Sequence, residues 1–365
     1  MGSNVKRLQR SLVAGICLAG LVGCTSRQPP LPVKQVNSAS SPALFAGSST
    51  NGGSTVPCVW SSTSRTDLPV PAGNYGIAVS PALSVGGTIY AAGMYRDSNN
   101  KPIPCYWAGA TCTPLTDGNV QGLGVAVAVS GNTVYTAGMV EIDNNYHPCY
   151  WSGTTLVDLV GDLTEGGMVS GIAIAADGTV RSAGFYQSSG GYEIACTWNG
   201  TQRTDLPSGN QDSEAYAMAF AMALSGNTVY TAGTATPTMP CYWTGTAGPT
   251  FLPVPTGATG YATAIAVSGG TVYLGGYYNN GSFKIPCVWT VTGAQSTRTD
   301  LAGDGVHSAE VRALSVSGTT VSAAGIYSLD GTHPIPCVWT GTTRTDLSVV
   351  ATYGNVWSAM ELLGS

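Results

Sequence analysis

The sequence predicts an all-β fold, a seven-bladed β-propeller with four strands in each blade. The first observation is the phrase Cys-x-Trp, which occurs seven times with steps of 44 to 50 residues between successive cysteines. The second is that each repeat contains four short strand-like runs, and the third is that the two chain ends carry complementary parts of one repeat. Strand-built repeats of this length are typical of propeller blades.

Residues 262–301 show the repeat unit. It begins with Ala-Thr-Ala-Ile-Ala-Val-Ser, turns at Gly269-Gly270 and continues as Thr-Val-Tyr-Leu-Gly-Gly-Tyr-Tyr. The third run ends in Ile-Pro-Cys-Val-Trp, and the fourth is Arg-Thr-Asp-Leu. These runs are rich in Val, Ile, Tyr, Thr and Trp and are bounded by Gly, Asn, Ser and Pro, as strands are. We name the four strands a, b, c and d in their order within the repeat.

Each strand type can be counted seven times along the chain. Strand a is expected near Ile77, Ala126, Ile172, Ala221, Ile265, Leu314 and Ser358. Strand b is expected near Phe45, Tyr90, Tyr135, Val180, Tyr230, Tyr273 and Val321. Strand c is marked by Cys58, Cys105, Cys149, Cys196, Cys241, Cys287 and Cys337. Strand d ends near Leu68, Leu115, Leu159, Leu206, Leu252, Leu301 and Leu347.

The order of strands at the termini predicts how the ring closes. The chain enters on a b strand at 43–47 and finishes on an a strand at 356–362. We therefore expect the C-terminal a strand to complete the N-terminal blade, which leaves only short outer edges exposed. An open β-solenoid of similar repeats is the alternative. A closed ring with short edges also favours a monomer.

Composition narrows the class of partner. Only 9% of the residues are charged, 43% are hydrophobic, 49 are glycine and the formal net charge is −5. The glycines suit a fold with many turns. An acidic chain without a basic patch argues against a nucleic-acid ligand.

The N-terminus predicts export and lipid anchoring. Lys6, Arg7 and Arg10 precede an apolar run from 11 to 23 that is too short to span a bilayer as a helix. This layout is that of a secretory signal, and Leu-Val-Gly-Cys24 resembles the bacterial lipobox. We expect a signal peptide at 1–23, a lipidated Cys24 in a flexible tether at 24–41 and the propeller at 42–365. An ordinary cleaved signal is the alternative.

The residue after the lipidated cysteine bears on location. It is Thr25 rather than Asp, which for lipoproteins of many bacteria with two membranes is associated with the outer membrane. The expected location is therefore the bacterial cell envelope, lipid-anchored at the outer membrane, on its periplasmic or exposed side.

Ten cysteines in an exported chain would ordinarily suggest disulfides. The seven repeat cysteines occupy equivalent places in separate blades, too far apart to be crosslinked, and we expect them to be small buried side chains. Cys112 is different, because a turn at Ala108-Gly109 would place it directly opposite Cys105. We expect a disulfide between Cys105 and Cys112. No metal-ligand spacing is present, so no metal site is expected.

The phrase Cys-x-Trp with a following Arg-x-Asp places four side chains on one face of each sheet, because strand residues alternate between faces. The arginine can then lie near the tryptophan and the aspartate, with cation–π and ion-pair contacts between blades. We interpret the set as structural, since it recurs in the repeats. A ring of ligand-binding sites is the alternative.

The repeat phrase Pro-Cys-x-Trp-x-Gly-x-x-Arg-Thr-Asp-Leu, followed by Ala-x-Ala-x-x-x-Ser-Gly-x-Thr-Val-Tyr-x-Ala-Gly, resembles the HAF-type extracellular repeat family. The resemblance covers 43–362. The chain has Pro-Cys where those repeats have His-Ala, and Ala-Val-Ser where they have Ile-Asn. The resemblance implies an exported β-repeat protein and supplies no catalytic residue.

Loop length distinguishes the two ends of the ring. The a–b turns are tight, whereas the b–c and d–a connections are longer, variable and rich in Tyr, Asp and Glu. Variable loops on a rigid scaffold are the usual seat of binding. The candidate ligand face consists of Tyr95, Asp97, Tyr146, His147, Tyr192, Glu193, Tyr216, Tyr278, His307, Glu310 and Trp357.

No catalytic motif is recognisable, and only three histidines are present. The favoured function is a non-catalytic module that binds a glycan, peptide or protein at the cell envelope, without a cofactor. The first alternative is a glycan- or peptide-processing enzyme with carboxylates at the propeller mouth. The second is a purely structural envelope protein. A carboxylate pair with a raised pKa at the mouth would favour the enzyme.

Overall fold

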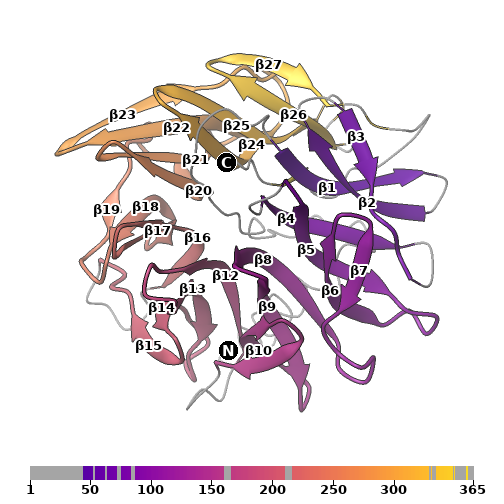
Figure 1. Ribbon diagram of the computed structural model, residues 1–365. Helices are drawn as coiled ribbons and strands as arrows, with labels where there is room; N and C mark the ends of the chain where they lie inside the picture. Colours follow the sequence, from indigo (N-terminus) through magenta and orange to yellow (C-terminus); the bar gives the residue numbers. More distant parts are fainter. Residues whose placement is uncertain are drawn as a thin grey trace, which may run out of the picture.

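The computed structural model describes residues 44–51, 54–61, 64–71, 75–83, 87–159, 166–209, 216–328, 330, 334–347, 349 and 359–360. In this part of the chain, seven antiparallel sheets of four strands each are arranged around a central axis (Figure 1). The predicted seven-bladed β-propeller is therefore confirmed. No helix of the described residues is long and apolar enough to cross a membrane.

The blades follow one another along the chain, and within each sheet the strands run from a at the axis to d at the rim. Blade 1 contains β28 (Ala359–Met360), β1 (Leu44–Asn51), β2 (Ser54–Ser61) and β3 (Ser64–Asp67). Blade 2 contains β4 (Gly76–Leu83), β5 (Ile89–Arg96), β6 (Pro102–Ala108) and β7 (Thr111–Pro114). Blade 3 contains β8 (Gly122–Ser130), β9 (Thr133–Ile142), β10 (Asn145–Ser152) and β11 (Thr155–Asp158).

The remaining four blades repeat the same order. Blade 4 contains β12 (Gly167–Ile174), β13 (Val180–Gln187), β14 (Glu193–Asn199) and β15 (Gln202–Asp205). Blade 5 contains β16 (Ala217–Ser225), β17 (Thr228–Ala235), β18 (Met239–Thr244) and β19 (Thr250–Phe251). Blade 6 contains β20 (Thr259–Ser268), β21 (Thr271–Asn279), β22 (Lys284–Thr292) and β23 (Gln295–Asp300). Blade 7 contains β24 (Ala309–Ser317), β25 (Thr320–Ser328), β26 (Pro334–Thr340) and β27 (Thr343–Asp346).

The ring closes through blade 1, as the sequence predicts. Strand β28 pairs antiparallel with β1, with Ala46 opposite Met360 and Gly47 opposite Ala359. The C-terminal strand therefore supplies the inner strand of the N-terminal blade, and it also lies against β4 of blade 2 and β24 and β25 of blade 7. The two ends of the chain hold the first and last blades together.

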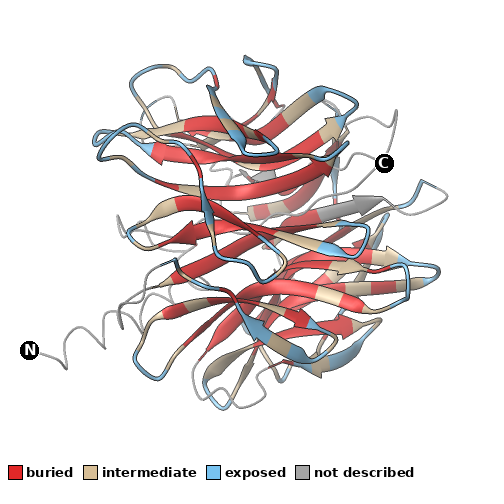
Figure 2. Cartoon of the chain, turned by 90° about the vertical axis from the view of Figure 1, so that its left-hand side faces the viewer, coloured by how far each residue is buried: buried red, intermediate tan, exposed pale blue. Residues whose placement is uncertain are grey.

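The repeated cysteines and tryptophans lie in the interior between blades, which Figure 2 shows as continuous buried strand segments. All seven cysteines of the repeat are buried free thiols, as expected, and burial raises the pKa of Cys58 to about 12. All seven tryptophans are buried as well. A thiol that stays protonated is inert, so these cysteines serve as packing groups.

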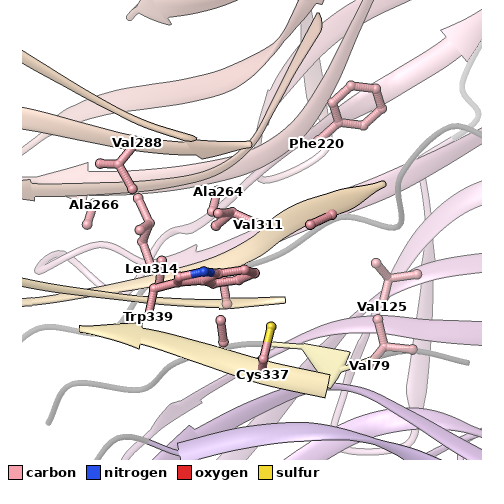
Figure 3. Packing of buried hydrophobic residues seen from close by; sticks show 14 of the residues in the cluster. Val79, Val125, Phe220, Ala264, Ala266, Val288, Val311, Leu314, Cys337 and Trp339 are labelled. Carbon is pink, nitrogen blue, oxygen red and sulfur yellow. The ribbon is translucent and has the colours of Figure 1, made fainter. Parts of the chain in front are cut away.

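Several tryptophans also donate a hydrogen bond to the preceding blade. The indole nitrogens of Trp107, Trp243, Trp289 and Trp339 donate to the carbonyl oxygens of Pro69, Pro207, Pro253 and Ala302 at 2.7 to 2.8 Å. Each acceptor directly follows the leucine that comes immediately after a d strand. The bond therefore fixes the rim of one blade to the face of the next, while the indole ring fills the space between them (Figure 3, Trp339).

Replacing Trp289 by Phe is expected to lower the free energy of unfolding by about 2 kcal/mol, because the Pro253 carbonyl oxygen loses its indole donor and a small cavity opens. Trp151→Phe is the matched control, since its indole nitrogen is buried and has no hydrogen-bond partner among the residues that the structure describes. Urea denaturation should show the Trp289 variant to be less stable than the Trp151 variant by about 1 kcal/mol. Equal losses would show that the indole hydrogen bond contributes nothing.

A β-bulge interrupts the inner strand of six blades. The pairing register shifts around Val79, Val125, Ser170, Phe220, Thr263 and Arg312. A glycine of strand b lies beside each bulge. In Gly233, for example, an added Cβ would lie 1.9 Å from the carbonyl oxygen of Met218. The bulge therefore brings two backbones closer than any side chain permits.

The hairpin register in blade 2 differs from the prediction. The turn is Gly109-Ala110, so Ala108 pairs with Thr111, Trp107 with Cys112 and Cys105 with Pro114. Cys105 and Cys112 are thus diagonal neighbours on one face rather than directly opposite, which is less favourable for a disulfide. Both are free thiols in the structure. The predicted register is wrong, and the disulfide itself stays a prediction.

The recurrent arginine contacts a tyrosine instead of the tryptophan. In blades 4, 6 and 7, the guanidinium carbons of Arg203, Arg298 and Arg344 lie 4.5, 4.5 and 3.6 Å from the ring centres of Tyr186, Tyr278 and Tyr327. Each arginine pairs with the aspartate two residues later, and the tyrosine hydroxyl donates to that aspartate. These contacts lie within one blade, so the predicted cation–π contact between blades is wrong.

Candidate functional site

The two ends of the ring differ in their connections. At one end the a–b turns of blades 3, 5 and 7 contain two residues, between Ser130 and Thr133, Ser225 and Thr228, and Ser317 and Thr320, whereas the a–b connection of blade 4 is longer. At the other end most b–c and d–a connections are longer, and the one before β24 runs from Leu301 to Ser308. The b–c connection of blade 3 is an exception to the prediction, because Asp143 and Asn144 alone join β9 to β10. We call the second end the loop end. Its rigid frame and longer connections make it the more suitable surface for a site.

Three of the predicted ligand-face residues are used between strands. The Tyr278 hydroxyl donates to Asp300 Oδ2 at 3.1 Å, and His147 Nδ1 lies 2.9 Å from Asp158 Oδ2. Tyr95 is buried in the cluster that contains Cys105 and Trp107. These side chains stabilise blades and are not available as a group to a ligand.

Other predicted residues form hydrogen bonds within or between loop-end connections. Asp97 accepts hydrogen bonds from the backbone nitrogens of Asn99 and Lys101. His307 Nδ1 lies 2.6 Å from Asp304 Oδ2, and Tyr216 shares a hydrogen bond with Thr238.

The remaining predicted residues do not converge on one site. Tyr146 and Tyr192 are half-buried, Glu193 is buried, and Trp357 lies outside the described residues. The structure therefore disperses most of the predicted face.

Glu310 is the exception, because two cations from neighbouring blades converge on it. Lys284 Nζ lies 2.6 Å from Glu310 Oε2, and the Arg312 guanidinium pairs with Oε1. The Glu310 side chain is 4% exposed, whereas those of Arg312 and Lys284 are 13% and 35% exposed. Both carboxylate oxygens are occupied, and solvent reaches mainly the lysine.

Aromatic rings continue this group around the inner strands. Lys284 Nζ lies 4.4 Å from the ring centre of Tyr277, and the rings of Tyr277 and Tyr261 are 5.4 Å apart. Tyr261 is in turn 5.9 Å from the ring of Phe220 in blade 5, which belongs to the large central hydrophobic cluster (Figure 3). We name Tyr261, Tyr277, Lys284, Glu310 and Arg312 the Glu310 cluster.

Strand ends place the cluster at the loop end. Glu310 is the second residue of β24, which the d–a connection enters, and Lys284 is the first residue of β22, which the b–c connection enters. The Lys284 backbone nitrogen also donates to Ser308 Oγ, so blade 6 is joined to the connection that precedes β24. The cluster thus lies near the axis, at the interface of blades 6 and 7.

The cluster breaks the symmetry of the repeat. Two residues before the bulge, blades 2 to 5 have the apolar side chains Ile77, Leu123, Met168 and Met218, whereas blades 6 and 7 have Tyr261 and Glu310. At the bulge itself, Arg312 is the one charged residue among the six. Buried charge is costly to stability, and such departures from local rules concentrate at functional sites.

The electrostatics of the cluster favour binding over proton transfer. Burial opposes ionisation of Glu310, but Arg312 and Lys284 outweigh it and lower the pKa of the carboxyl to about 2. A carboxylate held ionised in this way is a poor general acid or base at neutral pH. Among the described residues, no group of three or more His, Cys, Asp or Glu side chains is placed to hold a metal ion.

Glu193 presents the opposite electrostatic case. Burial raises the pKa of this carboxyl, and no neighbouring charge contributes to the shift. It is the first residue of β14, three residues before Cys196, as Lys284 is three residues before Cys287. It is therefore a protonatable group at the loop end, in another sector of the ring.

Sequence reasoning found Glu310 but missed Lys284, Arg312, Tyr261 and Tyr277 as its partners. Alignment of the a strands with one another would have found Glu310 and Arg312 as charged residues at positions that are otherwise apolar or neutral. Their convergence with Lys284 was not visible, because that requires the placement of one blade against the next.

No family model matches the chain, and a search of curated proteins finds no match. The resemblance to HAF-type repeats therefore stays a prediction.

Solved structures share the architecture. A puromycin-hydrolyzing peptidase of Mycobacterium tuberculosis is similar at 12% identity and a TM-score of 0.53, over 88% of this chain and 56% of the peptidase. An ulvan lyase of polysaccharide lyase family PL25 is similar at 9% identity and a TM-score of 0.49, over 75% of this chain and 82% of the lyase. A mutant Aleuria aurantia lectin in complex with alpha-methyl-L-fucoside is similar at 14% identity and a TM-score of 0.45, over 75% of this chain and 94% of the lectin. Likeness at such identities shows the fold alone.

Proposed function

We propose that the protein is a non-catalytic binding module that is anchored to the bacterial cell envelope through a lipid on Cys24 and takes up its ligand at the loop end. The fold by itself is compatible with binding or with catalysis. The observation that carries the proposal is the Glu310 cluster, in which Tyr261 and Glu310 stand where blades 2 to 5 have apolar side chains. Its ionised, fully paired carboxylate suits recognition better than proton transfer.

A binding experiment tests the proposed function. The full chain, purified in mild detergent, is applied to an array of glycans and peptides, and binding to one ligand class is expected. Tyr261→Ala should weaken that binding by more than about 1 kcal/mol, as loss of an aromatic anchor does. Asn132→Ala and Asn227→Ala, in a–b turns at the opposite end, should leave it unchanged. If these two variants lose binding and Tyr261→Ala does not, the site lies at the end of the a–b turns and the proposal is wrong.

His147 and Glu193 are unsuitable as test positions on this face. His147 is paired with Asp158 and Glu193 is buried, so replacing either changes packing as well as the surface. Tyr261 is half-buried and makes ring contacts in the cluster, so its melting temperature has to be compared with that of the unmodified chain.

The anchoring rests on the sequence, because Cys24 lies outside the described residues. In a bacterial host, Cys24→Ala should abolish metabolic labelling with radioactive palmitate and move the protein into the aqueous phase of a detergent partition. Cys17→Ala is the matched control, since Cys17 lies within the predicted signal. This replacement should leave palmitate labelling intact. Labelling that survives Cys24→Ala would refute the anchor.

A glycan- or peptide-processing enzyme is the second candidate, and the buried Glu193 favours it. Its raised pKa is a property of catalytic acids. If the protein is an enzyme, prolonged incubation with the ligand found on the array should release products, and Glu193→Gln should abolish that release without abolishing binding.

A further inference from the structure

The Glu310 cluster has an excess of positive charge. Lys284 and Arg312 both pair with the single carboxylate of Glu310, so the formal charge of the three side chains is +1. Two of them come from blade 7 and one from blade 6. A second acid that would balance this charge is not paired with either cation among the described residues.

Arg312 also retains donor capacity that the fold leaves unused. Its Nε and Nη2 atoms engage Glu310, while Nη1 is buried without a hydrogen-bond partner in the described structure. A buried donor without an acceptor destabilises the folded state. Guanidinium groups bind carboxylates in particular, because their donors match the spacing of two carboxylate oxygens.

Lys284 is the accessible part of the same group. Its side chain is the most exposed of the three, and its ammonium lies over the face of Tyr277. An anionic group that approaches from the loop end would therefore meet the ammonium first. The half-buried Tyr261 lies against the ring of Tyr277, and aromatic rings are groups on which sugar rings pack.

The whole chain limits how much negative charge the ligand can carry. The formal net charge is −5, so a polyanion would be repelled at long range. A ligand with one acid on a largely neutral body avoids this repulsion and still uses the local positive charge. The chemistry at the cluster and the charge of the chain thus select the same kind of molecule.

We infer that the loop end binds an acidic saccharide that carries a single uronic acid, whose carboxylate is held by Lys284 and Arg312 while the neighbouring sugar packs on Tyr261. This assignment rests on the proposed binding function and names the class of its ligand.

Isothermal titration of the full chain in mild detergent tests the assignment, with aldotetraouronic acid as the probe and neutral xylotetraose for comparison. The acidic sugar should bind at least about tenfold more tightly, and raising sodium chloride from about 50 to about 500 mM should reduce that preference. Lys284→Met should remove most of the preference, whereas Lys284→Arg should keep it within about threefold.

Lys101→Met is the matched control, because Lys101 ends the corresponding b–c connection of blade 2. It should leave the affinity within about twofold of the unmodified chain. Melting temperatures show whether both methionine variants are folded. If Lys284→Met does not fold, Lys284→Arg still tests the assignment, because loss of the preference in that variant would contradict it.

The outcomes separate this inference from the proposed function. Equal affinity for the acidic and neutral sugars, or a preference that survives Lys284→Met, overturns the uronate assignment and leaves a binding module intact. If a tetrapeptide with a free carboxylate binds instead of the uronate, and its binding depends on Lys284, the ligand is not a saccharide and the assignment is wrong. If no glycan or peptide on the array binds the protein, the proposed binding function itself is wrong.

Discussion

Deletion of residues 354–365 is expected to lower the melting temperature by more than about 10 °C and to cause aggregation. The deletion removes β28, whose residues Ala359 and Met360 pair with Gly47 and Ala46 of β1. Blade 1 then lacks its inner strand, and the contacts of β28 with blades 2 and 7 are lost. The inner edge of β1 would be left as an unpaired template for other chains. Scanning calorimetry and light scattering measure the two effects.

Removal of residues 30–41 is the matched control for this deletion. It takes the same number of residues from the predicted tether, before the first strand of blade 1. Its melting temperature should stay within about 2 °C of the unmodified chain, because no described strand is shortened. If the C-terminal deletion melts like this control, pairing of the chain ends does not hold the ring closed.

Replacement of Gly233 by Ala is expected to destabilise the protein by more than about 3 kcal/mol. A Cβ at this position would lie 1.9 Å from the Met218 carbonyl oxygen and 3.0 Å from the ring of Trp243. The carbonyl belongs to the backbone of β16 two residues before its bulge, so it cannot move without disturbing the pairing of β16 with β17. The midpoint of urea denaturation measures the loss.

Gly248→Ala controls for the change from glycine to alanine in the same blade. An added Cβ at Gly248 has no atom within 4 Å, so its effect should stay within about 0.5 kcal/mol. Two variants of equal stability would mean that the inner strand relaxes around the new methyl group, and that the close approach at the bulge is not a constraint.

The spacing of repeated phrases was sufficient to predict the blades because the strand pattern is local. Each d strand ends one residue before a predicted boundary leucine, from Leu68 to Leu347. The alternation of Cys, Trp, Arg and Asp placed them correctly on one face, as the pairing of Trp198 with Arg203 and Cys196 with Asp205 confirms. Closure was predictable because the terminal strands complement each other in type.

Hairpin register was less predictable, and the reason is steric. The turn predicted at Ala108-Gly109 begins at the glycine instead of ending there, and Gly200 likewise opens the two-residue turn of blade 4. Gly200 takes a φ of 61°, which favours glycine at the first turn position. Because of the same shift in blade 2, the cross-strand partner of Cys112 is Trp107 instead of the predicted Cys105.

By itself, the sequence determined the all-β class, the number of blades, the closing strand and the end of the ring with long connections. These properties depend on short-range patterns and on the matching of chain ends. Only the tertiary structure decided which loop-end residues meet. Tyr278 and His147 turned into the sheets because aspartates of their own blades offer partners, whereas Glu310 met Lys284 because packing sets β22 of blade 6 beside β24 of blade 7. Contacts between blades depend on strand twist and on the bulges, which the order of residues does not display.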